Sequence, residues 1–590
     1  MGANDPLALV RTLPSVATGN DLQASFPVRG GATADNLFEA DGARVVSPIH
    51  MLGLFSAFNP SYYRSYTFRP GRMPSTVPSL TSALFSADSG LEPDTCFSGS
   101  ATAGLIESHG ALRAPIVKNR LSLSVGFRRS YLDAVFPTLL SLGKSTLKYQ
   151  FTDLNAAVNA RVSDKDILRL SFFGNRDRLG LENHHNGYKE GTLGWSNVAT
   201  AATWRHSDIE TIVSYTGLSN TFQLEEGGAQ IDQPSYLRQF AARTLIPLGR
   251  LTAGADIAHR RVSGQNGFGR AASWEFNIAA DWEQPLSSRL SLTAGLRMAA
   301  YVNGSFTAWR PQPRLCFDFD LGRGYAAWLA AGRRVRFDKT VEESTSGLPT
   351  DFYICADAAA RPHDVWSAEL GFSGALPHTG ITFSAEAYYK LIRHEGEFAG
   401  SIVDLASPDY NPLADYLDGR GYAAGISLAL MRQVGKVRGR LGYNLGMARA
   451  RFDRFGDDYM PSAHDRPHDF NLSLNWSVLP PFTVSASFTY ASGTPYTRAK
   501  YGYMIGENLI CEYFPHNSSR LPAYRRLDLS ASWVFRSRAC SHTVNISVYN
   551  ALASHNVLFR YTSYTLDKGI QQRESVMKAV IPSVAYTITF

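Results

Sequence analysis

From about residue 95 to its C-terminus, the chain repeats one unit: an alternating segment, a short turn, a second alternating segment and a longer polar loop. In the last segment, 583–590, the apolar side chains occupy the even positions: Val584, Tyr586, Ile588 and Phe590. Successive side chains of a β-strand point to opposite faces, so this segment presents one apolar face and one face of small polar residues. The pattern restricts the chain to an all-β fold with many strands.

The alternation predicts about 22 strands, and an even number of antiparallel strands can close into a barrel that leaves no strand edge unpaired. They lie near 98–104, 106–115, 120–131, 147–161, 166–178, 191–207, 209–225, 233–246, 250–262, 270–284, 288–302, 309–321, 323–336, 361–375, 379–395, 419–433, 437–452, 467–478, 482–497, 522–536, 542–556 and 576–590.

The connections between these strands fall into two classes. Short turns follow the even-numbered strands, at 163–166, 207–210, 285–288, 321–324, 377–380, 434–436 and 479–481. Long loops follow many odd-numbered strands, at 132–146, 179–190, 337–360, 396–418, 498–521 and 557–575. Short turns at one end and long loops at the other are typical of a transmembrane β-barrel. A soluble propeller or tandem sandwiches would also alternate, but they would not explain this parity.

Composition is compatible with this fold and excludes several others. No apolar run approaches the roughly 18 residues of a membrane-spanning helix, whereas barrel strands need apolar residues only at alternate positions. The net charge of +7 comes without a dense Lys/Arg stripe, so no nucleic-acid partner is expected. The five cysteines lie far apart without a C-x-x-C pair, which argues against a zinc site. We expect neither metal nor cofactor.

The N-terminal residues have a different texture. They contain the pieces Asp5-Pro6-Leu7, Leu13-Pro14-Ser15-Val16, Val28-Arg29-Gly30-Gly31, Asn36-Leu37, Asp41-Gly42, Pro48-Ile49-His50 and Phe55-Ser56-Ala57-Phe58-Asn59-Pro60. The later chain adds Arg128-Arg129-Ser130-Tyr131, Ser492-Gly493-Thr494-Pro495-Tyr496, Arg526-Leu527-Asp528, Tyr549-Asn550 and Ile581-Pro582-Ser583. On these residues the chain resembles TonB-dependent outer-membrane receptors with the plug form common among Bacteroidetes. The resemblance implies a partial plug domain at 1–90 and a 22-stranded transmembrane barrel at 91–590.

The resemblance also assigns a role to Arg29, as the plug arginine that faces carboxylates of the barrel. Glu369 and Glu386 are its candidate partners. The fork of a guanidinium suits a removable contact with carboxylates. A surface arginine is the alternative. Gly30-Gly31 indicates a tight turn or a close approach of the backbone, and Asp41-Gly42 indicates a hairpin turn.

The function that the resemblance implies is uptake of a scarce nutrient, such as a peptide, glycan, siderophore or cobalamin. The implied partners are outer-membrane lipid, TonB, a surface lipoprotein and the barrel-insertion machinery, which reads the terminal strand ending in Phe590. The TonB box and the first plug strands are not found in the chain. A non-transporting binding or scaffold barrel therefore stays open as the alternative. No P-loop, G-x-S-x-G or H-E-x-x-H motif occurs, so we expect no enzyme.

The start of the chain, MGANDPLALV, has neither the basic segment nor the apolar core of a signal peptide. Because an outer-membrane protein must be exported, we expect the chain to be a mature form, a fragment or one that begins late.

Aromatic side chains gather in two of the long loops and are candidates for ligand contact: Tyr501, Tyr503, Tyr513, Phe514 and His516 in 498–521, with Tyr410 and Tyr416 in 396–418. Aromatic rings give large contact area at low entropic cost, although they could equally pack on neighbouring loops. His184-His185 is more simply explained by solvation than by metal binding. Cys355 and Cys511 are both expected on the outer side, either bridged or as free thiols.

Overall fold

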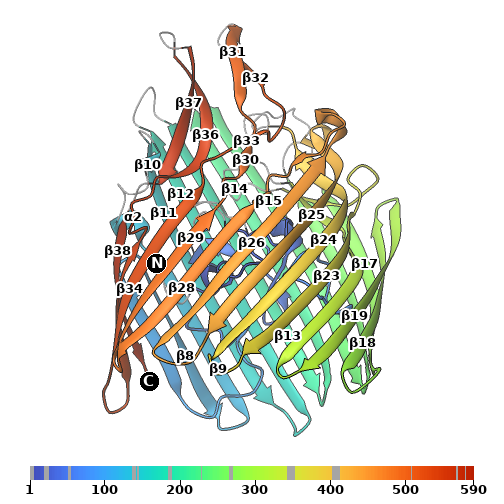
Figure 1. The fold of residues 1–590 in the computed structure, drawn as a ribbon, viewed down its shortest axis with the longest axis vertical. Helices are drawn as coiled ribbons and strands as arrows, with labels where there is room; N and C mark the ends of the chain where they lie inside the picture. The colour runs from blue at the N-terminus through green and yellow to red at the C-terminus, as the bar shows by residue number, and fades with distance from the viewer. Residues whose placement is uncertain are drawn as a thin grey trace.

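The computed structural model describes residues 5–590 except 19–25, 51–52, 54, 136–140, 143–144, 184–188, 227–228, 265–269, 342–351, 401–411, 506–507, 566–568 and 578–579. Within this part of the chain, no helix is long and apolar enough to cross a membrane. Figure 1 shows one large barrel of tilted strands that encloses the N-terminal segment, drawn in blue.

Among the described residues, 22 strands form the closed antiparallel barrel that the alternation predicts. They are β7 (Ser98–Gly104), β8 (Glu107–Val117), β9 (Leu121–Ser130), β11 (Ser145–Arg161), β12 (Asp166–Asn183), β13 (Lys189–His206), β14 (Ile209–Glu226), β15 (Ala229–Leu248), β16 (Leu251–Ser263), β17 (Ala271–Pro285), β18 (Leu290–Asn303), β19 (Phe306–Gly322), β20 (Tyr325–Arg336), β23 (His363–Leu376), β24 (Ile381–Phe398), β25 (Tyr416–Arg432), β26 (Val437–Arg451), β28 (His468–Leu479), β29 (Phe482–Ala491), β34 (Tyr524–Arg536), β35 (Ser541–Tyr549) and β38 (Ile581–Thr589). Neighbours in sequence pair with one another, and the pairings of β9 with β11 and of β38 with β7 close the ring.

Side chains alternate across the wall in the sense required of a membrane barrel. In β9, Leu123, Val125 and Phe127 point outward and are 37%, 38% and 52% exposed, whereas Ser124 and Arg128 point inward and are buried. Apolar side chains on the outside favour contact with lipid, and the polar side chains face the lumen. The sequence pattern therefore fixes which face of each strand meets the membrane.

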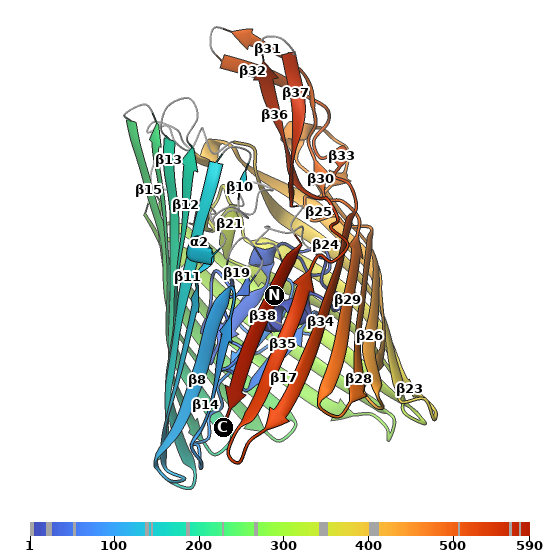
Figure 2. The ribbon, with the colours of Figure 1, turned by 90° about the vertical axis from the view of Figure 1, so that its left-hand side faces the viewer.

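Three predicted strands are too long at their outer ends. The predicted strands 482–497, 542–556 and 576–590 correspond to β29, β35 and β38, which stop at Ala491, stop at Tyr549 and begin at Ile581. Beyond these points the chain pairs with itself, as β30 (Pro495–Tyr496) with β33 (Ser519–Arg520), β31 (Ala499–Ile505) with β32 (Asn508–Tyr513), and β36 (Asn556–Thr565) with β37 (Gly569–Met577). These local pairs satisfy backbone groups that have no neighbour in the wall. Figures 1 and 2 show β31–β32 and β36–β37 rising above the barrel rim.

Two predicted loops also differ from the structure. The loop 179–190 is mostly strand, because β12 continues to Asn183 and β13 begins at Lys189. In the described parts of the loop 337–360, β21 (Asp338–Val341) pairs with β22 (Phe352–Cys355), and Figure 2 shows β21 inside the barrel. Cys355 packs there against Leu237 and Val262 of the wall. Apolar burial thus draws this segment inward from the position that its polar sequence suggested.

Short elements complete the outer connections. They are the helix α2 (Leu132–Val135), the strands β10 (Ser141–Leu142) and β27 (Met460–Pro461), which extend the sheet beside β11 and β26, and the 3-10 turns η3 (Pro412–Ala414) and η4 (Asp453–Phe455).

The N-terminal segment, called the plug below, fills the middle of the barrel. It contains α1 (Pro6–Val10), η1 (Thr33–Asp35), β1 (Leu37–Ala40), β2 (Ala43–Arg44), β3 (Ile49–His50), β4 (Phe55–Ser56), β5 (Ser65–Arg69) and β6 (Leu84–Asp88). A four-stranded sheet in the order β2-β1-β6-β5 forms its centre, and β3 pairs with β4. Asp41 and Gly42 make the predicted turn between β1 and β2, both with positive φ. Its core of Phe26, Phe38, Phe58 and Phe85 packs on small wall residues such as Ala111 and Ala157.

Candidate functional site

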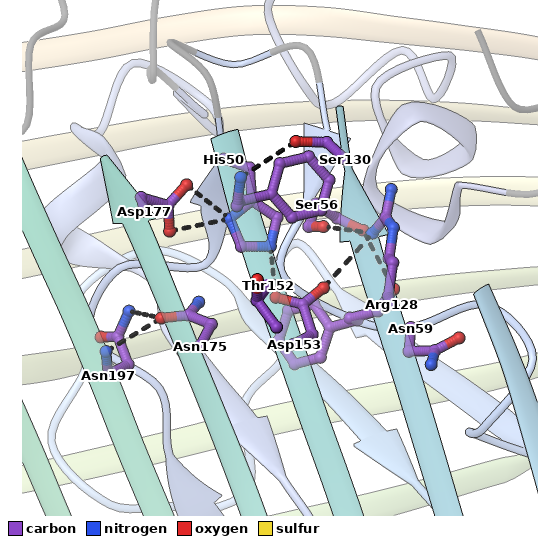
Figure 3. Close-up of polar contacts among 12 residues, drawn as sticks. His50, Ser56, Asn59, Arg128, Ser130, Thr152, Asp153, Asn175, Asp177 and Asn197 are labelled. Atoms are coloured by element: carbon purple, nitrogen blue, oxygen red, sulfur yellow. Dashed lines mark hydrogen bonds and ion pairs between the residues drawn. The ribbon is translucent and has the colours of Figure 1, made fainter. Parts of the chain in front are cut away.

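The plug is attached to the wall at a few clusters of buried charge, and His50 lies in one of them (Figure 3). Its Nε2 lies 2.8 Å from Asp153 Oδ1 on β11, and its Nδ1 lies 2.8 Å from Asp177 Oδ1 on β12. The ring stacks on Phe151 at a centroid distance of 4.0 Å. All three charged side chains are fully buried. One plug residue therefore bridges two adjacent wall strands.

Electrostatics keep this histidine charged. Burial by itself lowers the pKa of His50, but Asp153 and Asp177 outweigh that effect and raise the pKa to about 10. His50 is therefore an imidazolium at neutral pH: Nδ1 hydrogen-bonds Asp177, and Nε2 forms an ion pair with Asp153. Beside it, Asn197 binds the plug backbone at Ser47. Its amide group accepts from Ser47 N at 3.0 Å and donates to Ser47 O at 3.1 Å.

Arg128 of β9 makes the second cluster, adjacent to the first. Its guanidinium pairs with Glu107 at 2.6 Å and donates to the backbone oxygen of Ser56 at 2.8 Å. Asp5 lies at 4.0 Å from the same guanidinium. Asp5 also caps helix α1 through Ala8 N at 3.0 Å and accepts from Ser56 N at 2.8 Å. A wall arginine thus holds both α1 and β4 of the plug.

The third cluster contains the residues that the sequence analysis paired. Arg29 Nη1 lies 2.7 Å from Glu369 of β23, and Arg29 Nη2 pairs with Glu386 of β24. Arg29 is buried. Its neighbour Gly30 has φ +75°, and a Cβ placed there would lie 2.6 Å from Ala423 Cβ. Glycine at this position lets the plug turn come close enough to the wall for the arginine to reach both carboxylates.

A fourth cluster joins the plug to the inward hairpin β21–β22. Asp338 of β21 accepts from plug Arg44 at 2.6 Å and from Arg336 at 2.9 Å, and Arg260 of β16 lies at 3.9 Å. These residues, like Asp153 and Asp177, were not expected from the sequence to make plug contacts. The available signal was a charged residue on the lumen-facing phase of a strand, because such a residue cannot face lipid and needs a partner inside.

Three of the predicted ligand-loop residues lie together on the hairpin β31–β32. Tyr501, Tyr503 and Tyr513 are 48%, 47% and 58% exposed. Phe514 instead packs under the guanidinium of Arg498, at 4.2 Å from the ring centroid. The hairpin therefore offers three accessible phenol rings well above the plug.

The other predicted loop residues tie loops together. His516 stacks on Phe455 at 4.1 Å and pairs with Glu397. Tyr416 accepts from Lys339 Nζ at 2.6 Å. Tyr410 lies outside the described residues, as does the pair His184-His185.

The terminal residue and the cysteines have defined positions. Phe590 is 39% exposed at the end of the last strand and stacks on Phe97 at 5.7 Å. Cys355 and Cys511 are both free, so the disulfide alternative is wrong. The physical reason is separation, because Cys355 is buried against the wall inside the lumen whereas Cys511 belongs to the projecting hairpin β31–β32. Among the described residues, no group of three or more metal-ligating side chains is arranged to hold an ion.

Fold and site together define a class: a membrane β-barrel closed by an internal plug that buried ion pairs hold in place. A family model described as TonB dependent receptor-like, beta-barrel matches residues 102–551, well over half of the chain. The chain belongs to the TonB-dependent receptor family, and it is an outer-membrane protein. Members of this family are transporters rather than enzymes and interact with TonB. A search of curated proteins finds no match.

Solved structures share the whole architecture at low sequence identity. The FrpB iron transporter from Neisseria meningitidis has a TM-score of 0.71 and 12% identity, covering 100% of this chain and 97% of its own. The siderophore receptor PirA from Pseudomonas aeruginosa has a TM-score of 0.64 and 13% identity, and PirA from Acinetobacter baumannii has 0.68 and 10%. Both cover 100% of this chain and 96% of their own. At such identities the likeness establishes the fold.

Proposed function

We propose that this receptor captures a scarce nutrient on its outer loops and imports it past a plug that TonB displaces. The observation that carries the proposal is the manner in which the plug is held. Buried ion pairs attach it at several points: His50 to Asp177, Asp5 to Arg128, Arg29 to Glu369 and Arg44 to Asp338. Such ion pairs are strong at contact distance, but a small movement of the plug relative to the wall breaks each of them.

The outer loops have a direct connection to the plug. Asp338 belongs to the segment that leaves the barrel rim after β20, and it pairs with plug Arg44. Lys339 beside it donates to Tyr416 of β25. A ligand that displaces this hairpin would therefore break a plug contact. We take this as the route by which occupancy outside weakens the plug's attachment.

For the ligand we propose a ferric siderophore or a nutrient of similar size. The neighbouring structures named above are siderophore receptors and an iron transporter. Tyr501, Tyr503 and Tyr513 supply exposed ring faces at which an aromatic chelate can stack.

The test is uptake of a panel of iron-loaded siderophores by cells that carry this receptor in place of their own. The proposal requires accumulation of at least one chelate that stops when TonB is inactivated. The triple variant Tyr501→Ser, Tyr503→Ser, Tyr513→Ser should bind that chelate at least tenfold more weakly. Tyr459→Ser serves as the control, because Tyr459 is equally exposed, at 47%, on another outer loop.

Two results would reject the proposal. Accumulation that is the same with and without TonB would show that the plug is not displaced by that partner. Absence of binding to every siderophore, peptide and glycan offered would show a barrel without a nutrient ligand.

A further inference from the structure

A small pocket lies between the plug and the wall, beside the Arg29 contact. Its volume is about 50 Å³. The plug contributes residues 70–73, 75 and 80–82 to it, and the wall contributes strands β19, β20, β23 and β24. A water molecule needs roughly 10–15 Å³ by the same measure. The pocket therefore has room for a group of a few heavy atoms, which is far less than a siderophore.

Positive charge dominates the lining. Five of its side chains are cationic and only Glu369 is a carboxylate, which already pairs with Arg29. Three of the cations have carboxylate partners within the described chain: Arg72 with Asp318, Arg314 with Asp281, and Arg333 with Asp364. The remaining two cations are Arg334 and Lys390.

Arg334 and Lys390 have only neutral partners among the described residues. Arg334 donates to the backbone oxygens of Pro74 and Val77. Lys390 is 5% exposed and donates to Ser82 Oγ at 3.1 Å and to Val28 O at 3.5 Å. A buried cation, Lys390, and a half-buried one, Arg334, neither with an ion-pair partner among the described residues, are costly in a protein interior. An anion between them would remove that cost.

Gln312 of β19 supplies an independent sign of a missing partner. It lines the same pocket and is 2% exposed. Its Oε1 accepts from Val335 N at 3.1 Å, which fixes the orientation of the amide. Its Nε2 then has no hydrogen-bond partner in the described chain. A buried donor without an acceptor is rare in folded proteins.

We propose that this pocket binds one small oxyanion, either inorganic phosphate or the carboxylate group of a small solute. Lys390 would supply an ammonium, Arg334 a guanidinium, and Gln312 a neutral N–H donor, a combination suited to oxygen anions. Arg334 and Lys390 lie on the wall and also bind plug carbonyl or hydroxyl oxygens. The bound anion therefore offsets the charge of the two wall cations that hold these plug oxygens. This site is separate from the proposed nutrient site and does not depend on what is imported.

The experiment is calorimetric titration of the full chain in detergent, with phosphate in one arm and acetate in the other, at ionic strength fixed with chloride. We expect saturable binding at one site per chain for at least one anion, and the arm with tighter binding identifies the source. Lys390→Met should weaken binding at least tenfold. Lys436→Met is the matched control, because Lys436 is exposed in a short turn, and it should leave binding unchanged.

A second variant distinguishes loss of the anion site from misfolding of the protein. Gln312→Glu keeps the oxygen that accepts from Val335 N and places a carboxylate oxygen where Nε2 was. That carboxylate takes the place of the anion, so this variant should fold, migrate as an intact barrel and lose phosphate and acetate binding. Undiminished binding in Gln312→Glu, or the absence of saturable binding to either anion in the natural sequence, would overturn the proposal.

Discussion

Replacing His50 by leucine should detach the plug segment around β3 from the wall. The change removes the imidazolium from the fully buried Asp177 and leaves Asp153 with Arg128, at 3.9 Å, as its remaining ion-pair partner among the described residues. The difference between the ordinary pKa of 6.5 and the value of about 10 for His50 corresponds to ~5 kcal/mol, at about 1.4 kcal/mol per pKa unit. Removing one partner of a buried ion pair costs a similar 3–5 kcal/mol, roughly. We expect a loss of about that size in the free energy that holds this segment.

Hydrogen exchange followed by mass spectrometry measures this loss locally. The amide of Ala57 donates to Pro48 O at 2.7 Å and reports opening of the segment. A loss of 3–5 kcal/mol should speed its exchange by roughly 100- to 5,000-fold. His109→Leu is the control, because the one hydrogen bond of the His109 ring among the described residues is with the hydroxyl of Ser61, at 2.8 Å, and its loss should cost about 1 kcal/mol.

Two further measurements can refute the reasoning. Adding Asp153→Asn and Asp177→Asn to His50→Leu removes both carboxylates that lost the imidazolium, while Arg128 keeps its pair with Glu107 at 2.6 Å, so exchange should slow again by at least tenfold. Because the pKa of His50 is raised in the folded state, its stabilisation is complete below about pH 6.5 and is lost as pH rises through about 10. This reasoning would be contradicted by unchanged exchange in His50→Leu or by no recovery in the triple variant. It would also be contradicted if exchange in the natural sequence did not change between pH 7 and 10.

Arg29→Met leaves Glu369 buried without its cation and should weaken plug attachment by about 3–5 kcal/mol in urea titration, with partial recovery in Arg29→Met, Glu369→Gln; equal midpoints would count against it. Deleting Phe590, which ends the outward face of the last strand, should reduce the heat-modifiable, membrane-inserted fraction, and an equal yield would show that it is no assembly signal. A maleimide added to intact cells should label Cys511 but not Cys355, which is 4% exposed; rapid labelling of Cys355 would mean that its hairpin lies outside.

Most of the barrel was predictable because its determinants are local. Leu123, Val125 and Phe127 alternate with inward serines whatever the rest of the chain does, and this periodicity sets strand, face and direction. The lengths of the connections distinguished the end of the barrel with short turns from the end with long loops. The alternation also continues past Ala491 and Tyr549. Beyond these residues the chain no longer pairs with neighbouring wall strands and pairs with itself in local hairpins. Periodicity reports that a residue is extended but not which strand it pairs with.

The site was less predictable because its pairs join distant parts of the chain. Arg29 was identified through a motif. Its distance to Glu369 depends on the conformation of a plug turn, which the sequence does not specify. His50 was part of a motif without an assigned partner, and Asp153 and Asp177 were not singled out. Their pairing depends on the register of β11 against β12 and on the plug's orientation. The inward hairpin β21–β22 was missed because its burial depends on wall residues more than 70 positions away.

The central claim is that import requires the plug to move relative to the wall, and a reversible disulfide tests it most directly. Thr76 lies on the plug and Gly254 on β16, and a Cβ placed on Gly254 would lie 3.4 Å from Thr76 Cβ, near the roughly 3.5–4.5 Å of natural disulfides. In cells carrying Thr76→Cys with Gly254→Cys, oxidation should abolish uptake of the ligand while surface binding persists, and reductant should restore uptake. Each single variant should transport under both conditions. Uptake at the uncrosslinked rate, with the disulfide shown to be complete, would contradict the account.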